Sequence, residues 1–319
     1  MRIGILKGSF DPVLVAQLRY AEECVRRLHL DKVIFVLSSS GVNFSASFEE
    51  RLRMLSSALS GREDYAVLNE DGPMDDAEGI GTVAKGMFPG AEVVFLPDET
   101  ETDALETEAR ERIRSGRPVS GIVPSGAQEC IYLEGIYYPE TEREHLERLR
   151  CELDPERFSH TCRVVRQAAL YAERFSIDYR KARTAAMLHD CAKCIDKPTL
   201  FLLSGESEFI PPILHAPAGA VIARNRYGIT DDEVLRAIRL HCTGDAAMDK
   251  LCMAVFLADM TESGRDFPAV DEIRDAVWQS LEYGMLTALR YEMRYLKTKG
   301  SVVHPATERA LTYYRTKEA

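Results

Sequence analysis

The spacing of apolar residues changes near residue 139, and this change limits the possible folds more than any other feature of the chain. Before it, short apolar runs typical of buried strands alternate with helix-period segments; the runs lie at 2–6, 32–37 and 91–96 and the helical segments at about 13–28, 48–59 and 106–115. Strands that alternate with helices predict a parallel sheet covered by helices. After residue 139 strand signals vanish. We expect an α/β parallel-sheet domain followed by an all-α domain.

The length and a charge-dense segment indicate where the two folds meet. The chain has 319 residues, 45% of them hydrophobic, which is enough for two buried cores. Residues 140–150 are mostly charged and predict a solvated helix between the domains. We expect domains at 1–138 and 156–319 with a linker helix at 139–155. Within the second domain, helical stripes lie at 156–175, 178–194, 212–227, 231–242, 247–261 and 270–298.

The overall charge and the apolar runs exclude some classes of partner. The formal net charge is -11, which argues against nucleic acid as the main partner, because phosphate neutralisation needs clustered lysine and arginine. No apolar run approaches the roughly 20 residues that span a bilayer. The first six residues read as a strand and not as a signal peptide. We expect a cytoplasmic protein that does not contact membranes, and a homo-oligomer remains open.

The eight cysteines are scattered along the chain and do not resemble the framework of a small disulfide-rich protein. We expect reduced thiols. Cys191 and Cys194 have the spacing of a zinc or redox pair, but no second such pair exists in the sequence, and the segment reads as a helix. Packing cysteines are the favoured interpretation, and a redox or metal role is the alternative.

The helical half contains four histidines and two aspartates that are candidate ligands, and three of these six residues end apolar stripes. His189 follows Ala182 and Ala186 at helical spacing, so it faces the buried side of its helix. His241 and Asp259 end stripes of the same kind. Imidazole and carboxylate groups that converge from several helices are typical ligands of a metal ion. The candidate ligands are His160, His189, Asp190, His215, His241 and Asp259.

A single histidine on an apolar face is ordinarily a packed side chain with a backbone partner. Six buried titratable groups are different, because burying them without a cation carries a large desolvation cost. The sequence therefore predicts a metal site. Six ligands exceed what one ion with a bound water uses comfortably, so a dinuclear centre with Asp190 as the bridging carboxylate is expected.

The same residues carry a resemblance that covers about residues 150–315. The motifs are His160, His189-Asp190 with Ala192-Lys193, Leu214-His215-Ala216-Pro217-Ala218-Gly219-Ala220, His241-Cys242-Thr243-Gly244, Leu257-Ala258-Asp259, Gly264-Arg265 and His304-Pro305-Ala306-Thr307. In this order they resemble the YqeK-type HD-domain phosphohydrolases, the symmetrical diadenosine tetraphosphate hydrolases. The resemblance implies a nucleotide substrate cut into two molecules of ADP at a dinuclear iron centre. Manganese and zinc suit the same ligands.

The implied mechanism is metal-assisted hydrolysis, in which Asp190 holds the ions and cationic side chains bind the substrate. Lys193 and Arg265 could contact a phosphate, and a solvated surface charge is the alternative for each. Thr243 could donate its hydroxyl to a phosphate or could cap a helix end. His304 is more consistent with a packed or capping histidine than with a seventh ligand.

The N-terminal half resembles the nicotinate mononucleotide adenylyltransferases over residues 2–138, without their catalytic residues. The similar segments are Gly8-Ser9-Phe10-Asp11-Pro12, 48–55, Pro89 to Leu96 and Ile122-Val123-Pro124. The family's His-x-Gly-His signature, which binds the triphosphate, is replaced by Leu14-Val15-Ala16-Gln17. Its phosphate loop is replaced by Leu105 to Arg110, whose two glutamates would repel a triphosphate. The Gly-Ala-Asp strand end reads Leu96-Pro97-Asp98.

We therefore expect a degenerate nucleotidyltransferase-like domain in which adenylyl transfer is lost. Lys7, Gly8 and Ser9 could mark a vestigial nucleotide pocket, and a plain turn with a surface lysine is the favoured alternative. The predicted activity is hydrolysis of a dinucleoside polyphosphate by the HD domain. One alternative is an HD phosphohydrolase for another nucleotide, such as a deoxynucleotide or a cyclic dinucleotide. The other is a regulatory protein whose N-terminal module senses a pyridine nucleotide.

Overall fold

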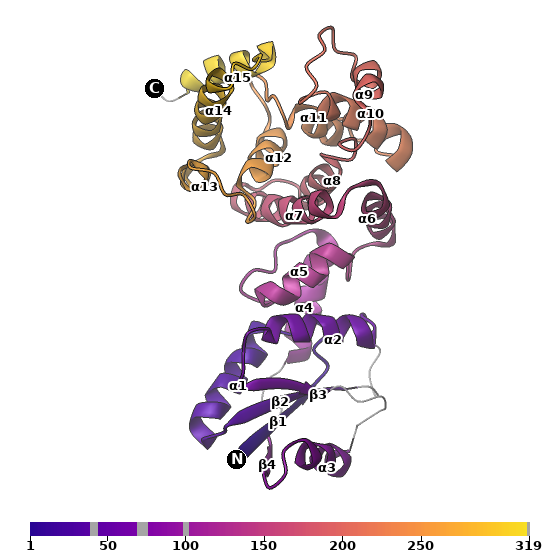
Figure 1. The fold of residues 1–319 in the computed structure, drawn as a ribbon, viewed down its shortest axis with the longest axis vertical. Helices are drawn as coiled ribbons and strands as arrows, with labels where there is room; N and C mark the ends of the chain where they lie inside the picture. Colours follow the sequence, from indigo (N-terminus) through magenta and orange to yellow (C-terminus); the bar gives the residue numbers. More distant parts are fainter. Residues whose placement is uncertain (39–43, 69–75, 98–101, 318–319) are drawn as a thin grey trace. The chain divides into compact units, whose positions relative to one another are not determined.

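A computed structural model describes residues 1–38, 44–68, 76–97 and 102–317, and the chain divides into two compact units. Unit 1 comprises Met1–Arg114 and Val119–Tyr138, and unit 2 comprises Ser115–Pro118 and Pro139–Ala319. Unit 1 contains a parallel sheet with helices, and the described part of unit 2 is helical throughout (Figure 1). The predicted fold class, α/β and then all-α, is confirmed.

Unit 1 is built on a four-stranded parallel sheet with the strand order β3-β2-β1-β4. The strands are β1 (Arg2–Gly8), β2 (Lys32–Leu37), β3 (Tyr65–Leu68) and β4 (Glu92–Phe95). Ile5 of β1 pairs with Ile34 on one side and with Phe95 on the other. The two central strands are nearly continuous apolar runs because helices cover parallel sheets on both faces. Their side chains form the core of the unit with Leu68, Ile80 and Ala84.

The described helices of unit 1 include two that the sequence did not predict. They are α1 (Val15–Leu28), α2 (Phe48–Leu59), α3 (Ala77–Met87), α4 (Thr102–Ser115) and α5 (Ser125–Glu134). The short β3, α3 and α5 were missed. Three glycines weaken the helical signal of α3, which is stabilised at its start by the Asp76 carboxylate accepting from Gly79 N at 2.6 Å. Helix α4 begins at Thr102, four residues before the predicted start.

Unit 2 consists of helices joined by turns. They are α6 (Glu140–Glu152), α7 (Pro155–Phe175), α8 (Tyr179–Leu188), α9 (Lys197–Ser204), α10 (His215–Tyr227), α11 (Asp232–Leu240), α12 (Lys250–Thr261), α13 (Val270–Gln279), α14 (Leu281–Thr298) and α15 (Pro305–Arg315). Aspartate carboxylates accept first-turn N–H groups at the starts of several of them, a contribution of about 1 kcal/mol each. These N-cap residues are Asp154, Asp178, Asp196, Asp231 and Asp249.

Helix α12 is the centre of unit 2 and packs against α7, α8, α11, α13 and α14. Every residue from Leu251 to Ala258 is buried, as expected for a helix that is apolar on all sides. Asp259 lies next, where the buried part of the helix ends. The ends of α8 and α11 also lie beside α12, because both helices pack on it. Polar residues at the ends of these elements are thereby brought together.

Several predicted boundaries in unit 2 were wrong. The helix predicted at 178–194 ends at Leu188, and residues 189–194 form turns. In these turns backbone N–H groups donate to the carbonyl oxygen of the third preceding residue, as Lys193 N does to Asp190 O at 2.9 Å. The helix predicted at 270–298 is interrupted at Ser280, whose side chain accepts from Tyr283 N and starts α14. Helices α9 and α15 were not predicted.

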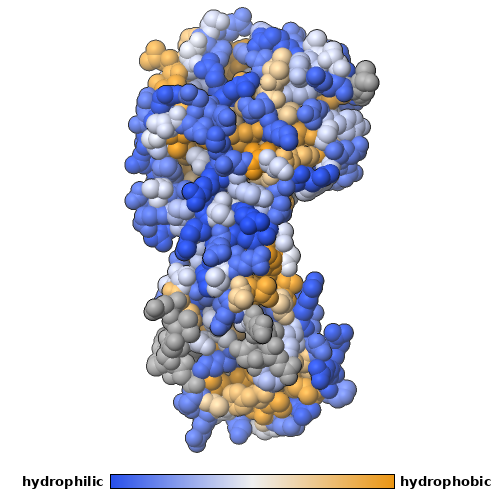
Figure 2. All heavy atoms as spheres, turned by 180° about the vertical axis from the view of Figure 1, so that it is seen from behind, coloured by the Kyte–Doolittle hydropathy of each residue, from blue (hydrophilic) through white to orange (hydrophobic). Residues whose placement is uncertain are grey.

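The surface of unit 2 that is visible in Figure 2 is mainly hydrophilic, in keeping with the high content of charged residues. Among the described residues, no helix combines the length and the apolar character needed to cross a bilayer. Trp278, the single tryptophan of the sequence, lies in α13 and is partly exposed.

Candidate metal centre

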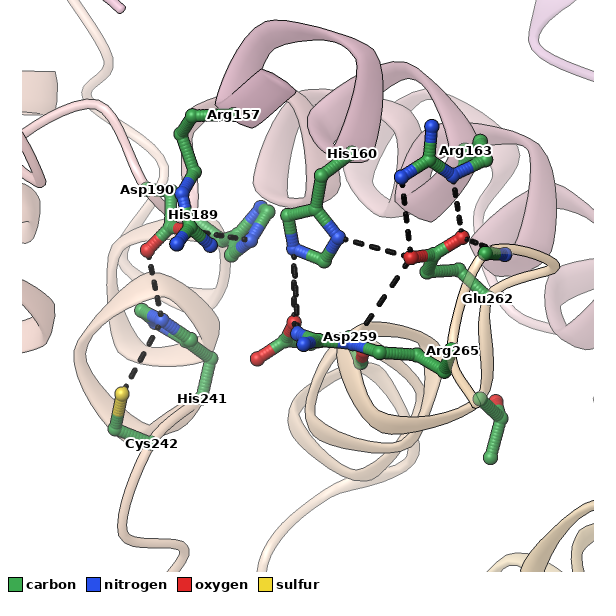
Figure 3. Close-up of polar contacts among 12 residues, drawn as sticks. Arg157, His160, Arg163, His189, Asp190, His241, Cys242, Asp259, Glu262 and Arg265 are labelled. Atoms are coloured by element: carbon green, nitrogen blue, oxygen red, sulfur yellow. Dashed lines mark hydrogen bonds and ion pairs between the residues drawn. The ribbon is translucent and has the colours of Figure 1, made fainter. Parts of the chain in front are cut away.

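His160 lies in the second turn of α7 and contacts two carboxylates (Figure 3). Its Nε2 lies 3.0 Å from Asp259 Oδ1, and its Nδ1 lies 3.1 Å from Glu262 Oε1. With the proton on Nδ1, the ring donates to Glu262 and directs the Nε2 lone pair toward Asp259. Metal-ligating histidines are commonly oriented in this way by a carboxylate behind the ring. His160 Nε2 and Asp259 Oδ1 are therefore placed to share a cation.

Glu262 is a buried residue of this site that the sequence analysis missed. Its side chain accepts from Arg163 Nε at 2.6 Å and from the backbone N–H of Gly264. Burial opposes ionisation, but hydrogen bonds from His160 and Arg163 lower the pKa of Glu262 to about 2. A Cβ at Gly264 would lie 2.6 Å from Arg163 Nε, so the glycine is needed for this approach. The Gly264-Arg265 motif thus supports the Glu262 carboxylate.

His189 and Asp190, the HD pair, lie at the C-terminal end of α8. His189 is fully buried, and its Nδ1 donates to the Ala186 carbonyl oxygen at 2.7 Å. That bond leaves Nε2 as an acceptor, and among the described residues neither this nitrogen nor Asp190 Oδ1 has a hydrogen-bond partner. The other oxygen, Asp190 Oδ2, accepts from Arg157 Nη1 at 2.9 Å. Two buried acceptors without donors are costly in a folded protein unless a ligand satisfies them.

His215, at the start of α10, and His241, which ends α11, face Asp190 from the other side. Their Nε2 atoms lie 3.2 Å apart, and they lie 3.2 and 3.6 Å, respectively, from Asp190 Oδ1. His241 Nδ1 donates to the Ile238 carbonyl oxygen at 2.7 Å, which fixes its ring as in His189. Cys242 Sγ lies 3.0 Å from His215 Nε2. Three acceptor-rich side chains and a thiol therefore meet at this end.

All six predicted ligands occur in groups whose ligand atoms lie within 4.8 Å of one another. The groups are His160, His189 and Asp259; His189, Asp190 and His241; and His215, His241 and Cys242. The groups share members, so the side chains form one continuous cluster. Nitrogen and oxygen donors with unpartnered lone pairs fit a divalent metal ion. The cluster could therefore bind metal.

A cavity of about 220 Å³ lies beside the cluster, and three arginines line it together with His160 and Glu262. The arginines are Arg157, Arg163 and Arg265, and the side chain of each remains about one third exposed. Arg265 donates through Nε to the Asp259 carbonyl oxygen at 2.8 Å and also contacts the Asp259 carboxylate. The three guanidinium groups orient the carboxylates that they contact, and their exposed N–H groups face the cavity. Arg157 and Arg163 were not predicted from the sequence.

The other predicted residues lie near the cluster in different roles. Lys193 Nζ lies 2.9 Å from His215 Nε2 and 3.7 Å from Asp190 Oδ1, so it is not an isolated surface charge. The Thr243 hydroxyl donates to the Gly244 carbonyl oxygen at 3.0 Å. His304 Nδ1 accepts from Ala306 N at the start of α15, which confirms the capping interpretation.

The predicted location of the Cys191 and Cys194 pair on a helix was wrong, because both lie in the turns after α8. Cys191 is buried, and its thiol donates to the Gly219 carbonyl oxygen at 3.5 Å. Cys194 is exposed, and its sulfur lies 3.8 Å from Asp154 Oδ2. The two thiols have different partners and are not joined in a disulfide.

Unit 1 contains a second buried polar cluster at the end of β1. The Ser9 hydroxyl lies 2.7 and 2.8 Å from the two oxygens of Glu106, and Gln17 Nε2 donates to Glu106 at 3.1 Å. Arg110 lies 3.6 Å from Asp11 and 3.7 Å from Glu106. Burial raises the pKa of Glu106, against the effect of the hydrogen bonds from Ser9 and Gln17. Glu106 thus accepts the hydrogen bonds that the side chains of Ser9 and Gln17 donate near the end of β1.

Only one of the two glutamates expected to repel a triphosphate is part of that cluster, because Glu108 is exposed. Asp98, which stands at the altered strand end, lies outside the described residues.

Comparisons with known proteins divide the chain in the same way. Residues 157–264 match the HD domain family, and residues 5–118 match the cytidylyltransferase-like family. A solved structure from Clostridium acetobutylicum, a predicted HD superfamily hydrolase involved in NAD metabolism, is 29% identical with a TM-score of 0.52. The alignment covers 55% of this chain and 97% of that one.

Two relatives extend the comparison. The symmetrical bis(5'-nucleosyl)-tetraphosphatase of Bacillus subtilis is 33% identical over 177 residues, covering 52% of this chain and 94% of its own length. A protein of Mycoplasma genitalium, a probable nicotinate-nucleotide adenylyltransferase/Ap4A hydrolase, is 25% identical over 93% of this chain and 99% of its own length. The two domains of this chain therefore occur together elsewhere.

Proposed function

This chain belongs, through its HD domain, to the family of the symmetrical bis(5'-nucleosyl)-tetraphosphatases, and we propose that it hydrolyses diadenosine tetraphosphate to two molecules of ADP. The observation that carries the proposal is the pair of unpartnered buried acceptors, His189 Nε2 and Asp190 Oδ1, at the centre of six potential ligands. An ordinary protein core satisfies such atoms internally. A site that leaves them open is suited to a metal.

We propose a dinuclear centre, with His160, His189 and Asp259 on one ion and His215 and His241 on the other. The Asp190 carboxylate contacts His189 on one side and His215 and His241 on the other, so it would hold both ions. Iron is the expected metal, and manganese and zinc suit the same donors. When bound, the ions would neutralise charge on the phosphoryl oxygens and lower the pKa of an attacking water.

The side chains around the ligands have two tasks in this proposal. Arg157 and Arg265 hold the Asp190 and Asp259 carboxylates in place, as their hydrogen bonds indicate. Lys193 and the exposed parts of the arginines supply donors for the phosphate oxygens of the substrate. Because four phosphates carry several negative charges, a row of cations beside the metal ligands favours a polyphosphate over a simple monoester.

The test is product analysis with diadenosine tetraphosphate after loading the full chain with Fe²⁺ or Mn²⁺. We expect ADP as the sole nucleotide product, since ATP and AMP together would indicate asymmetrical cleavage. Asp190→Ala should abolish the release of ADP. The matched control is Asp196→Ala, which removes an exposed carboxylate that caps α9 and should cost only about 1 kcal/mol of stability. ADP release by folded Asp190→Ala would overturn the proposal.

A panel of other phosphate compounds separates the proposed substrate from the alternatives. Deoxynucleoside triphosphates and cyclic dinucleotides should be cleaved with a lower kcat/KM than diadenosine tetraphosphate under the same metal loading. A preference for one of them would keep the metallohydrolase and replace its substrate. Failure of every compound with metal-loaded protein would favour a regulatory role.

A further inference from the structure

Cys242 follows His241 directly and points at the same space as the His215 and His241 rings (Figure 3 labels His241 and Cys242). Its sulfur lies 3.0 Å from His215 Nε2 and 3.5 Å from His241 Nε2. The Nδ1 bond from His241 to Ile238 keeps the lone pair of His241 Nε2 on the side of the thiol. The sulfur is therefore part of the cluster and not a neighbour that faces away.

An independent observation indicates that this group of atoms is built for a ligand. Asp190 is 2% exposed, and within the part of the chain that the structure describes its Oδ1 forms no hydrogen bond, although it lies 3.2 Å from His215 Nε2. The donors within reach of these atoms are the Cys242 thiol, an imidazole N–H and the Lys193 ammonium, whose Nζ lies 2.9 Å from His215 Nε2 and 3.7 Å from Asp190 Oδ1. A cation bound by His215, His241 and Cys242 would take the place of that ammonium beside His215 Nε2.

The separations agree with ligands around one tetrahedral ion. Typical bond lengths to zinc give about 3.3 Å between two nitrogen ligands and about 3.6 Å between nitrogen and sulfur. The Nε2 atoms of His215 and His241 lie 3.2 Å apart, and the sulfur lies 3.0 and 3.5 Å from them. Asp190 Oδ1 lies 3.2 and 3.6 Å from the same nitrogens. The sulfur lies closer to His215 Nε2 than that geometry gives, so a small side-chain adjustment would bring the donors of His215, His241 and Cys242 to one ion.

We propose that Cys242 is a thiolate ligand of the ion held by His215 and His241. The inference rests on the metal centre of the proposed function and adds a sulfur donor to it. Binding releases the thiol proton to solvent and forms one metal–sulfur bond, with no change in oxidation state. A soft thiolate favours iron, cobalt or zinc over manganese and magnesium at this end of the cluster.

The experiment loads metal-free full-length protein with Co²⁺ alone and records the near-ultraviolet sulfur-to-cobalt charge-transfer band. Wild type should develop the band as cobalt binds. Cys242→Ser should bind cobalt at least about tenfold more weakly and lose the band, while its manganese affinity changes less. Cys194→Ser is the control, because its exposed thiol contacts Asp154 and lies outside the three ligand groups; it should retain the band.

The outcomes separate the two proposals. Cobalt binding by wild type without the band, or with a band that Cys242→Ser retains, would overturn the thiolate ligand and leave the metal centre standing. No cobalt binding to wild type would overturn both. If Cys242→Ser does not fold, X-ray absorption of the zinc-loaded wild type decides, because a ligand sulfur scatters at about 2.3 Å. Nitrogen and oxygen neighbours alone would refute the proposal.

Discussion

The two units each bury a cluster of charged and polar side chains, but only one of these clusters is satisfied by its own chain. In unit 1, the carboxylate of Glu106 accepts from Ser9 and Gln17, and Arg110 lies close to it. Among the described residues of unit 2, His189 Nε2 and Asp190 Oδ1 are equally buried and form no hydrogen bond, although histidine and lysine nitrogens lie close to Asp190 Oδ1. The difference identifies which cluster is prepared for a ligand from solution.

The contrast follows from the cost of burying polar atoms. A buried acceptor without a donor costs roughly 1–3 kcal/mol, so a protein normally closes such a site internally. Unit 1 closes its site internally, because the Glu106 carboxylate accepts the hydrogen bonds of the Ser9 hydroxyl and the Gln17 amide, and an anionic ligand would need these donors. In unit 2 the buried acceptors His189 Nε2 and Asp190 Oδ1 keep this energetic cost, and binding of a metal ion would remove it. This difference supports the proposed assignment of the hydrolase activity to the helical unit.

Removal of the metal should have the largest effect and should act on unit 2 alone. Chelation is expected to abolish hydrolysis. A metal present at a thousandfold excess over its Kd stabilises the folded unit by about 4 kcal/mol, so Tm of unit 2 should fall by roughly 10 °C on chelation. Trp278 lies in α13, so its fluorescence reports that unit. Hydrogen exchange of β1 and β2 should remain unchanged. Equal effects on both units would contradict the comparison.

Replacing Glu262 should weaken the same site without removing a proposed ligand. Glu262→Gln keeps the shape of the side chain but loses the charge that orients His160 from behind its ring. Loss of such a supporting partner typically lowers metal affinity by about 10- to 100-fold. Calorimetric titration of the metal-free protein with Mn²⁺ measures the change. Glu272→Gln, at an exposed position of α13, should not alter the affinity; equal losses in both variants would point to a general charge effect.

The sequence predicted His189, His241 and Asp259 because each ends an apolar stripe, whereas His160 and His215 were identified through the motifs of the resembling family. The helix ends of α8, α11 and α12 are brought together by packing that the stripes themselves require. Periodicity could not mark the end of α8, since Cys191 and Ala192 in the following turns are also buried.

Glu262, Cys242 and Arg157 were missed for a different reason. Glu262 follows α12 in a turn, and its role depends on how α7 and α12 approach each other. Cys242 is adjacent to His241, and a helical pattern assigns only one of two neighbours to the inner face. Arg157 lies one helical turn before His160, and this spacing was the available signal in the sequence. The partner of Arg157, Asp190, is distant in sequence. Such contacts arise only when the helices are packed.

The pH dependence of unit 1 should reveal the internal carboxylate. Burial raises the pKa of Glu106 above its ordinary value of 4.5. The folded state therefore takes up the proton first, and the stability of unit 1 should rise as pH falls through the raised pKa, until the unfolded chain is protonated as well. Calorimetry measures this change in the unfolding transition of unit 1. That transition is recognised because the fluorescence of Trp278, which lies in unit 2, does not change with it.

Glu106→Gln removes the titrating group and should abolish that rise, while Glu108→Gln at an exposed position should preserve it. The wild type should bind no detectable ATP at unit 1 and transfer no adenylyl group to nicotinate mononucleotide. Tight binding of ATP by wild-type unit 1 would break the comparison, because it would show that the internal cluster still opens to a ligand.

The smallest effect is expected at Thr243, which lies beside the cluster but has an internal partner. Thr243→Val removes the hydroxyl that donates to the Gly244 carbonyl oxygen and should cost about 1 kcal/mol of stability. KM should stay the same, because a hydroxyl that is already bonded to the backbone is not available to a phosphate. Thr298→Val is the matched control, since that hydroxyl donates to the Arg294 carbonyl oxygen at 2.9 Å. A tenfold rise in KM for Thr243→Val alone would mean that the hydroxyl turns toward the substrate, and that this end of the cluster rearranges when substrate binds.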